Sequence, residues 1–147
     1  MAKKLLLFAF AAFLLISPSG TAIAKGHERS SGNLNMATQA LEQLRQAYVE
    51  RNAQEFFKWV SDTPYFNWQD LKFQIVRHFS DFGQIDLVWV VNESLTEGNK
   101  VLLKTHWRKR WVNNATGVVE LAEGDTQFVF VTKKNAKLID IKGNSPF

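Results

Sequence analysis

Residues 100–112, KVLLKTHWRKRWV, decide how the rest of the chain can fold. Apolar and charged side chains alternate along this stretch, and successive side chains of a β-strand point to opposite faces of a sheet. One face carries four apolar side chains and a threonine: Val101, Leu103, Thr105, Trp107 and Trp111. The other face carries one leucine and the basic set: Leu102, Lys104, His106, Arg108 and Arg110. The pattern predicts a strand with one covered side and one solvent-exposed side.

The same period of two continues on both sides of this strand, over residues 84–142. It predicts three further strands, at residues 85–92, 118–132 and 137–142. Short connections rich in Gly and Asn separate them, which favours antiparallel neighbours. Gly124 lies inside the third of the four strands, where a glycine predicts a bulge. We therefore expect a four-stranded antiparallel meander.

Upstream of the meander, apolar residues recur every three or four positions, which is the period of a helix. Three helices are expected: one over about residues 35–51, a short one after Asn52, and one after Asn67. Both asparagines are good N-caps, and Glu55 stands three residues after the first, as in a capping box. The fold class is therefore α+β, with three N-terminal helices packed into the curved sheet to form a cone.

Residues 1–24 have the composition of a cleavable signal peptide. A basic start with Lys3 and Lys4 precedes twelve consecutive apolar residues, and small residues at Ala22 and Ala24 end the segment. Twelve helical residues span roughly 18 Å, well short of a ~30 Å hydrocarbon layer, so a spanning anchor is disfavoured. The segment predicts cleavage after Ala24, a periplasmic or secreted location, and no membrane attachment afterwards.

The remainder divides into a flexible tether over residues 25–34, which is almost free of apolar side chains, and one domain over residues 35–147. The sequence has no Cys, so it can form neither a disulfide nor a lipid-modified cysteine. The net charge is +4 for the whole chain and +2 without the two leader lysines. A charge so close to balance gives no reason to expect nucleic acid as a partner.

Two stretches resemble the nuclear transport factor 2-like superfamily, the SnoaL-like and cystatin-like cone proteins. LRQAYVERNAQEFFKWVSD (residues 44–62) resembles its opening, in which a helix, a short polar break and a second helix ending at an acidic residue follow one another. TQFVFVTKKNAKLIDIKG (residues 126–143) is similar to its two closing strands. The resemblance covers residues 37–147. The chain departs from it at Asn52-Ala53, where many members have Gly-Asp, and at Leu138, where many have an aromatic residue.

The resemblance implies a cone that holds a small apolar ligand, or a sheet face that pairs with a partner such as a second copy or an envelope protein. Enzymes of the superfamily include steroid isomerases, polyketide cyclases, dehydratases and epoxide hydrolases, which hold an acid or base in an apolar cavity. In this chain no acid falls on an apolar strand face, and Tyr48 stands about one position from the tyrosine that the isomerases use. His78 and His106 are flanked by charged positions, so we expect both to be solvated or structural.

The aromatic residues are the remaining candidates for a site. Either they fill a core, or some of them line a pocket inside the cone, and the proposed pocket residues are Tyr48, Tyr65, Trp68, Trp89, Trp107 and Trp111. We predict no catalytic residue, metal ligand or cofactor, because no phosphate loop, serine elbow or metal-spaced histidine pair is present. The sequence favours a non-catalytic binding role. The alternative is an isomerase- or dehydratase-type enzyme that works on a small substrate by proton transfer.

Overall fold

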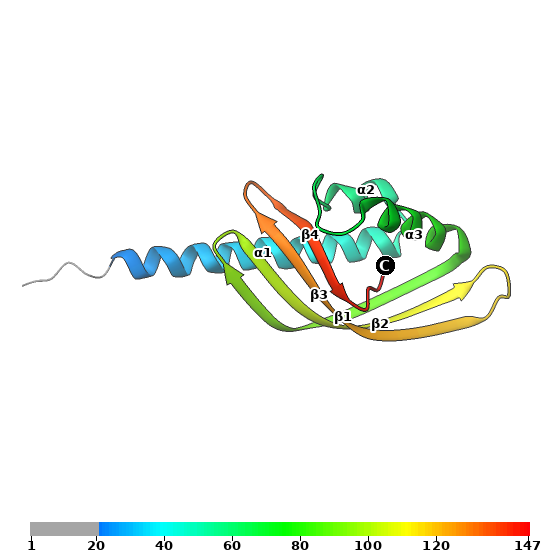
Figure 1. Cartoon of the computed structure of the whole chain (residues 1–147). Coiled ribbons are helices and arrows are strands. Elements are labelled where there is room, and N and C mark those ends of the chain that lie inside the picture. The colour runs from blue at the N-terminus through cyan, green and yellow to red at the C-terminus, as the bar shows by residue number, and fades with distance from the viewer. Residues whose placement is uncertain (1–20) are drawn as a thin grey trace, which may run out of the picture.

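The computed structural model describes residues 21–147, and most of the predicted signal peptide lies outside them. Three helices precede four antiparallel strands that pair in chain order, β1-β2-β3-β4 (Figure 1). The element bounds are α1 Thr21–Val49, α2 Ala53–Lys58, α3 Trp68–Asp81, β1 Phe82–Glu97, β2 Lys100–Asn113, β3 Val119–Thr132 and β4 Ala136–Gly143. The α+β prediction is confirmed, as is the meander of four strands.

The alternation along β2 sets the orientation of the whole sheet. Val101 pairs with Phe130 and Leu103 with Phe128 on β3, and all four side chains are buried. Trp107 is buried on the same face. The helices cover this face: α1 runs along the sheet and contacts all four strands, with α2 and α3 beside it (Figure 1). The prediction that the apolar side of the central strand faces the helices is confirmed.

The two shorter helices begin at the caps that the sequence predicts. The Asn52 side chain accepts a hydrogen bond from the backbone N–H of Glu55 at 3.0 Å, at the start of α2. The Asn67 side chain accepts from the N–H groups of Gln69 and Asp70, at the start of α3. Each cap satisfies donors that have no partner within the helix, which fixes where the helix starts.

The first helix is longer than the sequence predicts. It begins at Thr21, not near Asn35, so residues 25–34 are helical where the composition predicts a flexible tether. The segment contains no proline to interrupt the hydrogen-bond ladder, and its two glycines, Gly26 and Gly32, each weaken a helix by only about 1 kcal/mol. Asn33 also donates to the Gly98 carbonyl at 2.9 Å, in the β1–β2 turn. A lack of apolar residues therefore does not exclude a helix here.

The bulge predicted at Gly124 is also wrong. The β2–β3 pairing runs through Trp107 and Gly124 without a shift of register, and the irregularities lie in β1 and between Val129 and Phe130. A Cβ atom at Gly124 would lie 2.9 Å from the Trp107 ring and 3.0 Å from the Cβ of Asn144. Glycine is needed here for close approach of a ring, which is the second common reason for a strand glycine.

No helix within residues 21–147 is long and apolar enough to cross a membrane.

Candidate functional site

A lysine lies on the buried face of the sheet. Lys109 stands on β2 between Trp107 and Trp111, two positions from each, so its side chain points inward with theirs and is only 7% exposed. Its Nζ donates to the Pro146 carbonyl at 2.7 Å and to the Tyr48 hydroxyl at 3.3 Å. No carboxylate among the described side chains, residues 30–147, forms an ion pair with it. The cone therefore holds a cation without a counter-ion.

Aromatic rings surround this amine. Its nitrogen lies 5.0 Å from the ring centre of Trp111, 5.6 Å from that of Tyr48 and 5.8 Å from that of Phe82. Ring faces attract a cation, by up to about 2 kcal/mol where water is excluded. They do not replace water fully, and burial lowers the pKa of Lys109 from 10.5 to about 8. The group is still protonated at neutral pH, at a cost to the folded state.

Tyr48 connects the lysine to a histidine. Its hydroxyl lies 2.8 Å from Nδ1 of His78, whose ring stacks on Phe82. Burial, and then the charge of Lys109, lower the pKa of His78 to about 4, so the imidazole is neutral at pH 7. Burial also raises the pKa of Tyr48 well above its ordinary value. Since an ammonium has no acceptor, the Tyr48 oxygen accepts from Lys109 and its proton is directed to His78.

The end of the sequence fills the space beside these groups. Residues 144–147, which we call the tail, follow β4 and turn into the cone (Figure 1). The Phe147 ring is 4% exposed and contacts four rings from α1, α2 and two strands. The centroid distances are 4.9 Å to Phe56, 5.1 Å to Tyr48, 5.9 Å to Phe128 and 6.3 Å to Trp89. We call this aromatic pocket, together with Lys109, the interior site.

Trp107 holds the backbone of the tail. Its indole Nε1–H donates to the Asn144 carbonyl at 2.8 Å and to the Thr126 hydroxyl at 2.9 Å. The Thr126 hydroxyl in turn donates to the Asn144 carbonyl, and the Asn144 N–H donates to the Asp125 carbonyl at 3.0 Å. The tail is thus attached at Asn144 and inserts Pro146 and Phe147 into the interior site.

The six predicted pocket residues have different positions. Tyr48 and Trp89 line the interior site, Trp111 lies against Lys109, and Trp107 binds the tail. Tyr65 is 68% exposed, with its ring near Lys100, and does not reach the interior. Trp68 packs on Phe57 at 4.7 Å, one ring removed from the site. The structure therefore brings four of the six to the site or its supports.

Three residues of the site were missed or discounted at the level of sequence. Lys109 stands two positions from Trp107 and two from Trp111 on the same strand. Because side chains alternate between the two faces of a strand, this spacing alone places Lys109 on the covered face. His78, expected to be solvated or structural, is half-buried and forms a hydrogen bond with Tyr48. Phe147 follows the last strand, where no periodic pattern exists to place it.

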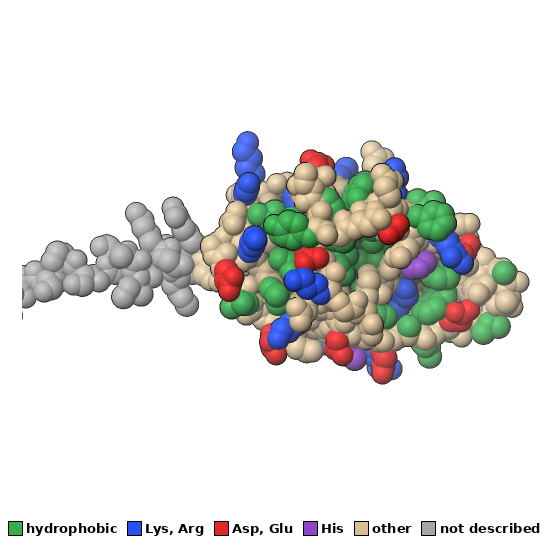
Figure 2. Space-filling model, in the orientation of Figure 1, with side chains coloured by type: hydrophobic (Ala, Val, Ile, Leu, Met, Phe, Trp, Pro, Cys, Tyr) green, Lys and Arg blue, Asp and Glu red, His purple; other side chains and the backbone are tan. Residues whose placement is uncertain are grey.

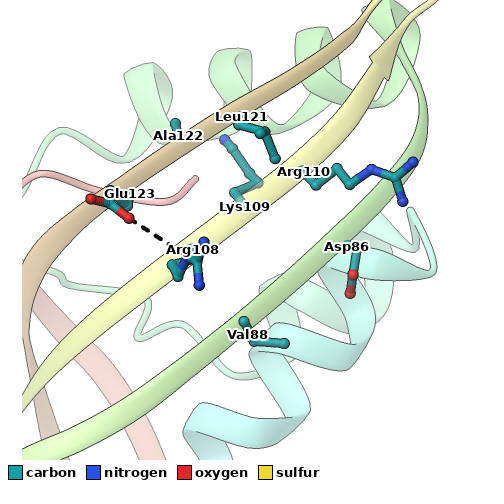
Figure 3. Close-up of a pocket in the computed structure, with 8 residues that line it drawn as sticks. All are labelled: Asp86, Val88, Arg108, Lys109, Arg110, Leu121, Ala122 and Glu123. Carbon is teal, nitrogen blue, oxygen red and sulfur yellow. Dashed lines mark ion pairs between the residues drawn. The ribbon is translucent and has the colours of Figure 1, made fainter.

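The larger hollows lie outside the cone. One of about 490 Å³ lies on the outer face of the sheet, where Arg108 pairs with Glu123 at 3.6 Å and Arg110 and Asp86 lie across from each other (Figure 3). His106 is on this outer face too and pairs with Asp125 at 3.0 Å. On the face shown in Figure 2, charged side chains of both signs lie between the hydrophobic ones. Within the described residues no group of three or more His, Asp or Glu gathers as a metal site would require.

Comparison with known proteins shows the fold. No protein-family model matches the sequence, and neither does any curated protein. Among solved structures, a nuclear transport factor 2 (NTF2-like) superfamily protein from Salmonella enterica serovar Typhimurium is similar over 81% of this chain and 94% of its own, with a TM-score of 0.67 and 10% identity. The chain has the NTF2-like fold.

Two further solved structures show what the NTF2-like fold carries elsewhere. A ketosteroid isomerase-like protein from Erwinia carotovora atroseptica matches over 78% of this chain and 98% of its own, with a TM-score of 0.62 and 16% identity. The association domain of CaMKII from C. elegans matches over 80% of this chain and 99% of its own, with a TM-score of 0.60 and 8% identity. The NTF2-like fold includes both enzymes and non-catalytic binding proteins, so the fold alone does not determine the role of this chain.

Proposed function

We propose that the protein is a non-catalytic binding domain that holds an apolar small molecule inside its cone. The observation that carries the proposal is the Phe147 ring, which occupies a pocket walled by Tyr48, Phe56, Trp89 and Phe128. A pocket that accepts a phenyl ring from the chain itself has the shape and the apolar lining that a free ligand of similar size needs.

The buried residues argue against acid–base chemistry by a carboxyl group. Within residues 30–147, whose burial the structure describes, the buried polar residues are three threonines and Lys109, with no Asp or Glu among them. A carboxyl group with its pKa raised by an apolar cavity, the usual proton carrier of such sites, is therefore not among the described residues of the cone.

A proton-transfer enzyme of the isomerase or dehydratase type is the second candidate. The chain of contacts from Lys109 through Tyr48 to His78 favours it, because burial lowers the pKa of Lys109 to about 8 and the neutral imidazole offers Nδ1 as a hydrogen-bond acceptor to Tyr48. Such a role would require the substrate to reach Tyr48, in the place now taken by Phe147.

Native mass spectrometry of the protein purified from its own host tests the binding role. We expect a retained small molecule, and an empty protein under gentle conditions would contradict the proposal. The recovered compound, incubated with fresh protein and followed by NMR, then separates the two candidates. A binding protein leaves the compound unchanged, whereas an enzyme converts it and loses that activity in Tyr48→Phe.

We also propose export and self-association, each on separate grounds. The composition of residues 1–24 supports export to the periplasm or the medium, and the mass of the protein isolated from the host tests cleavage after Ala24. The outer face of the sheet carries Arg108 and Arg110 beside Asp86 and Glu123, charges of both signs that a second copy, or an envelope protein, could match. Light scattering in solution distinguishes a monomer from a dimer.

A further inference from the structure

We propose that the interior site binds an aromatic or similarly apolar carboxylate, with the carboxylate on Lys109 and the apolar body in the place of Phe147, and that the tail is displaced when it binds. This inference rests on the proposed binding function and names the class of its ligand. It follows from the chemistry of two neighbouring parts of one site.

The apolar part of the ligand follows from the pocket. The Phe147 ring packs against the rings of Tyr48, Phe56 and Phe128. Its contacts with Phe56 and Tyr48 are T-shaped, with centroid distances of 4.9 Å and 5.1 Å. T-shaped ring contacts favour a flat ring, because they add stabilisation to that gained from the buried area. The preferred occupant is therefore a molecule with a ring, or an apolar group of the same size.

The anionic part follows from Lys109. Lys109 is 7% exposed, and among the described side chains its ammonium has two hydrogen-bond partners, both neutral: the Pro146 carbonyl at 2.7 Å and the Tyr48 hydroxyl at 3.3 Å. A buried cation gains more from an anion than from a neutral oxygen, because the charge is then compensated where water cannot screen it. Trp111, whose ring faces the ammonium, also has a buried indole N–H without an acceptor among the described residues.

The Lys109 ammonium and the aromatic pocket lie close enough together for one small molecule to contact both. Lys109 binds the carbonyl of Pro146, and the ring of the next residue fills the pocket. The tail thus presents an oxygen to the lysine and a phenyl ring to the pocket, as an arylalkanoate would, but without a negative charge on that oxygen. The tail therefore reproduces the ring and the oxygen of the proposed ligand but not its negative charge.

The tail can move out of the interior site while the sheet stays folded. It begins beyond β4, which ends at Gly143, and its hydrogen bonds to the strands are those of Asn144 and the one from Lys109 to the Pro146 carbonyl. Gly143 makes the turn into the cone with a φ of 90°, and a Cβ there would lie 2.7 Å from the Asp125 carbonyl. Rotation at this glycine moves residues 144–147 while the four strands stay paired.

The test compares 3-phenylpropionate with its neutral analogue 3-phenylpropan-1-ol, by calorimetry. The proteins are the intact chain, Phe147→Ala, and Phe147→Ala combined with Lys109→Met. Phe73→Ala, which removes a phenylalanine that is 68% exposed on α3, is the matched control. We expect Phe147→Ala to bind the acid roughly tenfold to a hundredfold more tightly than the intact chain, because the competing ring is gone. Phe73→Ala should bind it as the intact chain does.

In Phe147→Ala the acid should bind at least about tenfold more tightly than the alcohol, and Lys109→Met should abolish that preference. Equal binding of the acid and the alcohol would overturn the carboxylate assignment and leave the proposed binding function standing. If Phe147→Ala binds neither probe, the inference is wrong, and native mass spectrometry then decides the proposed function separately.

A measurement on the intact chain keeps the inference testable if a variant does not fold. The Trp107 indole N–H donates to the Asn144 carbonyl, which moves when the tail leaves. Millimolar 3-phenylpropionate should therefore shift this proton in a ¹⁵N–¹H NMR spectrum, and the alcohol should shift it less. Saturable binding of the acid with an unchanged Trp107 signal would refute displacement of the tail.

Discussion

Replacing Lys109 with Met should stabilise the folded protein at neutral pH. Burial lowers the pKa of this amine from 10.5 to about 8, so its protonated form is less stable in the folded than in the unfolded chain by about 3 kcal/mol. At pH 7 the amine is protonated in both states, and the folded state bears the full penalty. Methionine is unbranched and of similar length, and it has no charge to desolvate.

Part of this gain is offset by lost contacts. Lys109 donates to the Pro146 carbonyl, and a hydrogen bond from a charged donor contributes about 1.5–3 kcal/mol. The net stabilisation at pH 7 is therefore about 1 kcal/mol. The net stabilisation is a small difference between two larger free energies. The pH dependence of the stability difference is therefore the sharper test.

The direction of that dependence follows from proton binding. The unfolded chain keeps the Lys109 proton up to about pH 10.5 and the folded chain only to about pH 8, so in this window the unfolded state binds more protons. The stability of the native protein therefore rises across the window, and Lys109→Met lacks this contribution. Two other titratable groups face the amine. The pKa of His78 is about 4, outside the window. Burial raises the pKa of Tyr48 in the folded chain, and its titration in the unfolded chain near pH 10 is common to the native protein and to Lys109→Met, so it cancels when the two are compared.

Urea unfolding followed by tryptophan fluorescence at pH 7, 8, 9 and 10 measures the effect. The free energy of unfolding of Lys109→Met, relative to the native protein, should fall by about 2 kcal/mol from pH 7 to pH 10. Lys104→Met is the control, since Lys104 lies on the outer face of the same strand and pairs with Glu93 at 2.6 Å. A difference that stays constant with pH, or a loss of more than about 2 kcal/mol at pH 7, would refute the reasoning.

Three further predictions follow from single contacts. Asn67→Ala should reduce the free energy of unfolding by about 1 kcal/mol in urea titrations, because α3 loses its N-cap, and no loss would show that the cap is dispensable. Gly124→Ala should cost about 1–3 kcal/mol and shift the Trp107 indole signal, because the new Cβ would lie 2.9 Å from that ring; an unchanged signal would contradict this. Stability should fall as the pH drops from about 6.5 towards 4, because the unfolded chain takes up the His78 proton first, and the fall should be smaller in His78→Gln; equal slopes would disprove it.

The strands and helix caps were predictable because each depends on local chemistry. Alternation along residues 100–112 fixed which side of β2 is covered, and the side-chain oxygens of Asn52 and Asn67 fixed two helix starts. The start of α1 was not predictable in this way. Residues 25–34 lack an apolar stripe, but burial and helicity are different properties, and no residue there forbids a helix.

The interior site was predictable only in part, for two physical reasons. The hydrophobic pattern treats lysine as a solvent residue, so Lys109 is passed over although its position on the strand is that of a core residue. The Phe147 ring depends on a turn at Gly143 and on a carbonyl held by Trp107, two contacts made across the fold. A four-residue tail has no period of its own, so only the tertiary structure can place it.

The position of Lys109 is hard to explain by stability alone. An apolar side chain there would pack between Tyr48, Phe82 and Trp111 without a desolvation penalty, and such replacements of buried charges are often stabilising. Local rules of folding are broken mainly at functional sites, where the penalty is offset by a ligand. A variant that is more stable and yet loses its preference for the carboxylate would show both effects in one side chain. If Lys109→Met instead gains stability and keeps the preference, the lysine is no part of the binding site, and the filled cone is only a core.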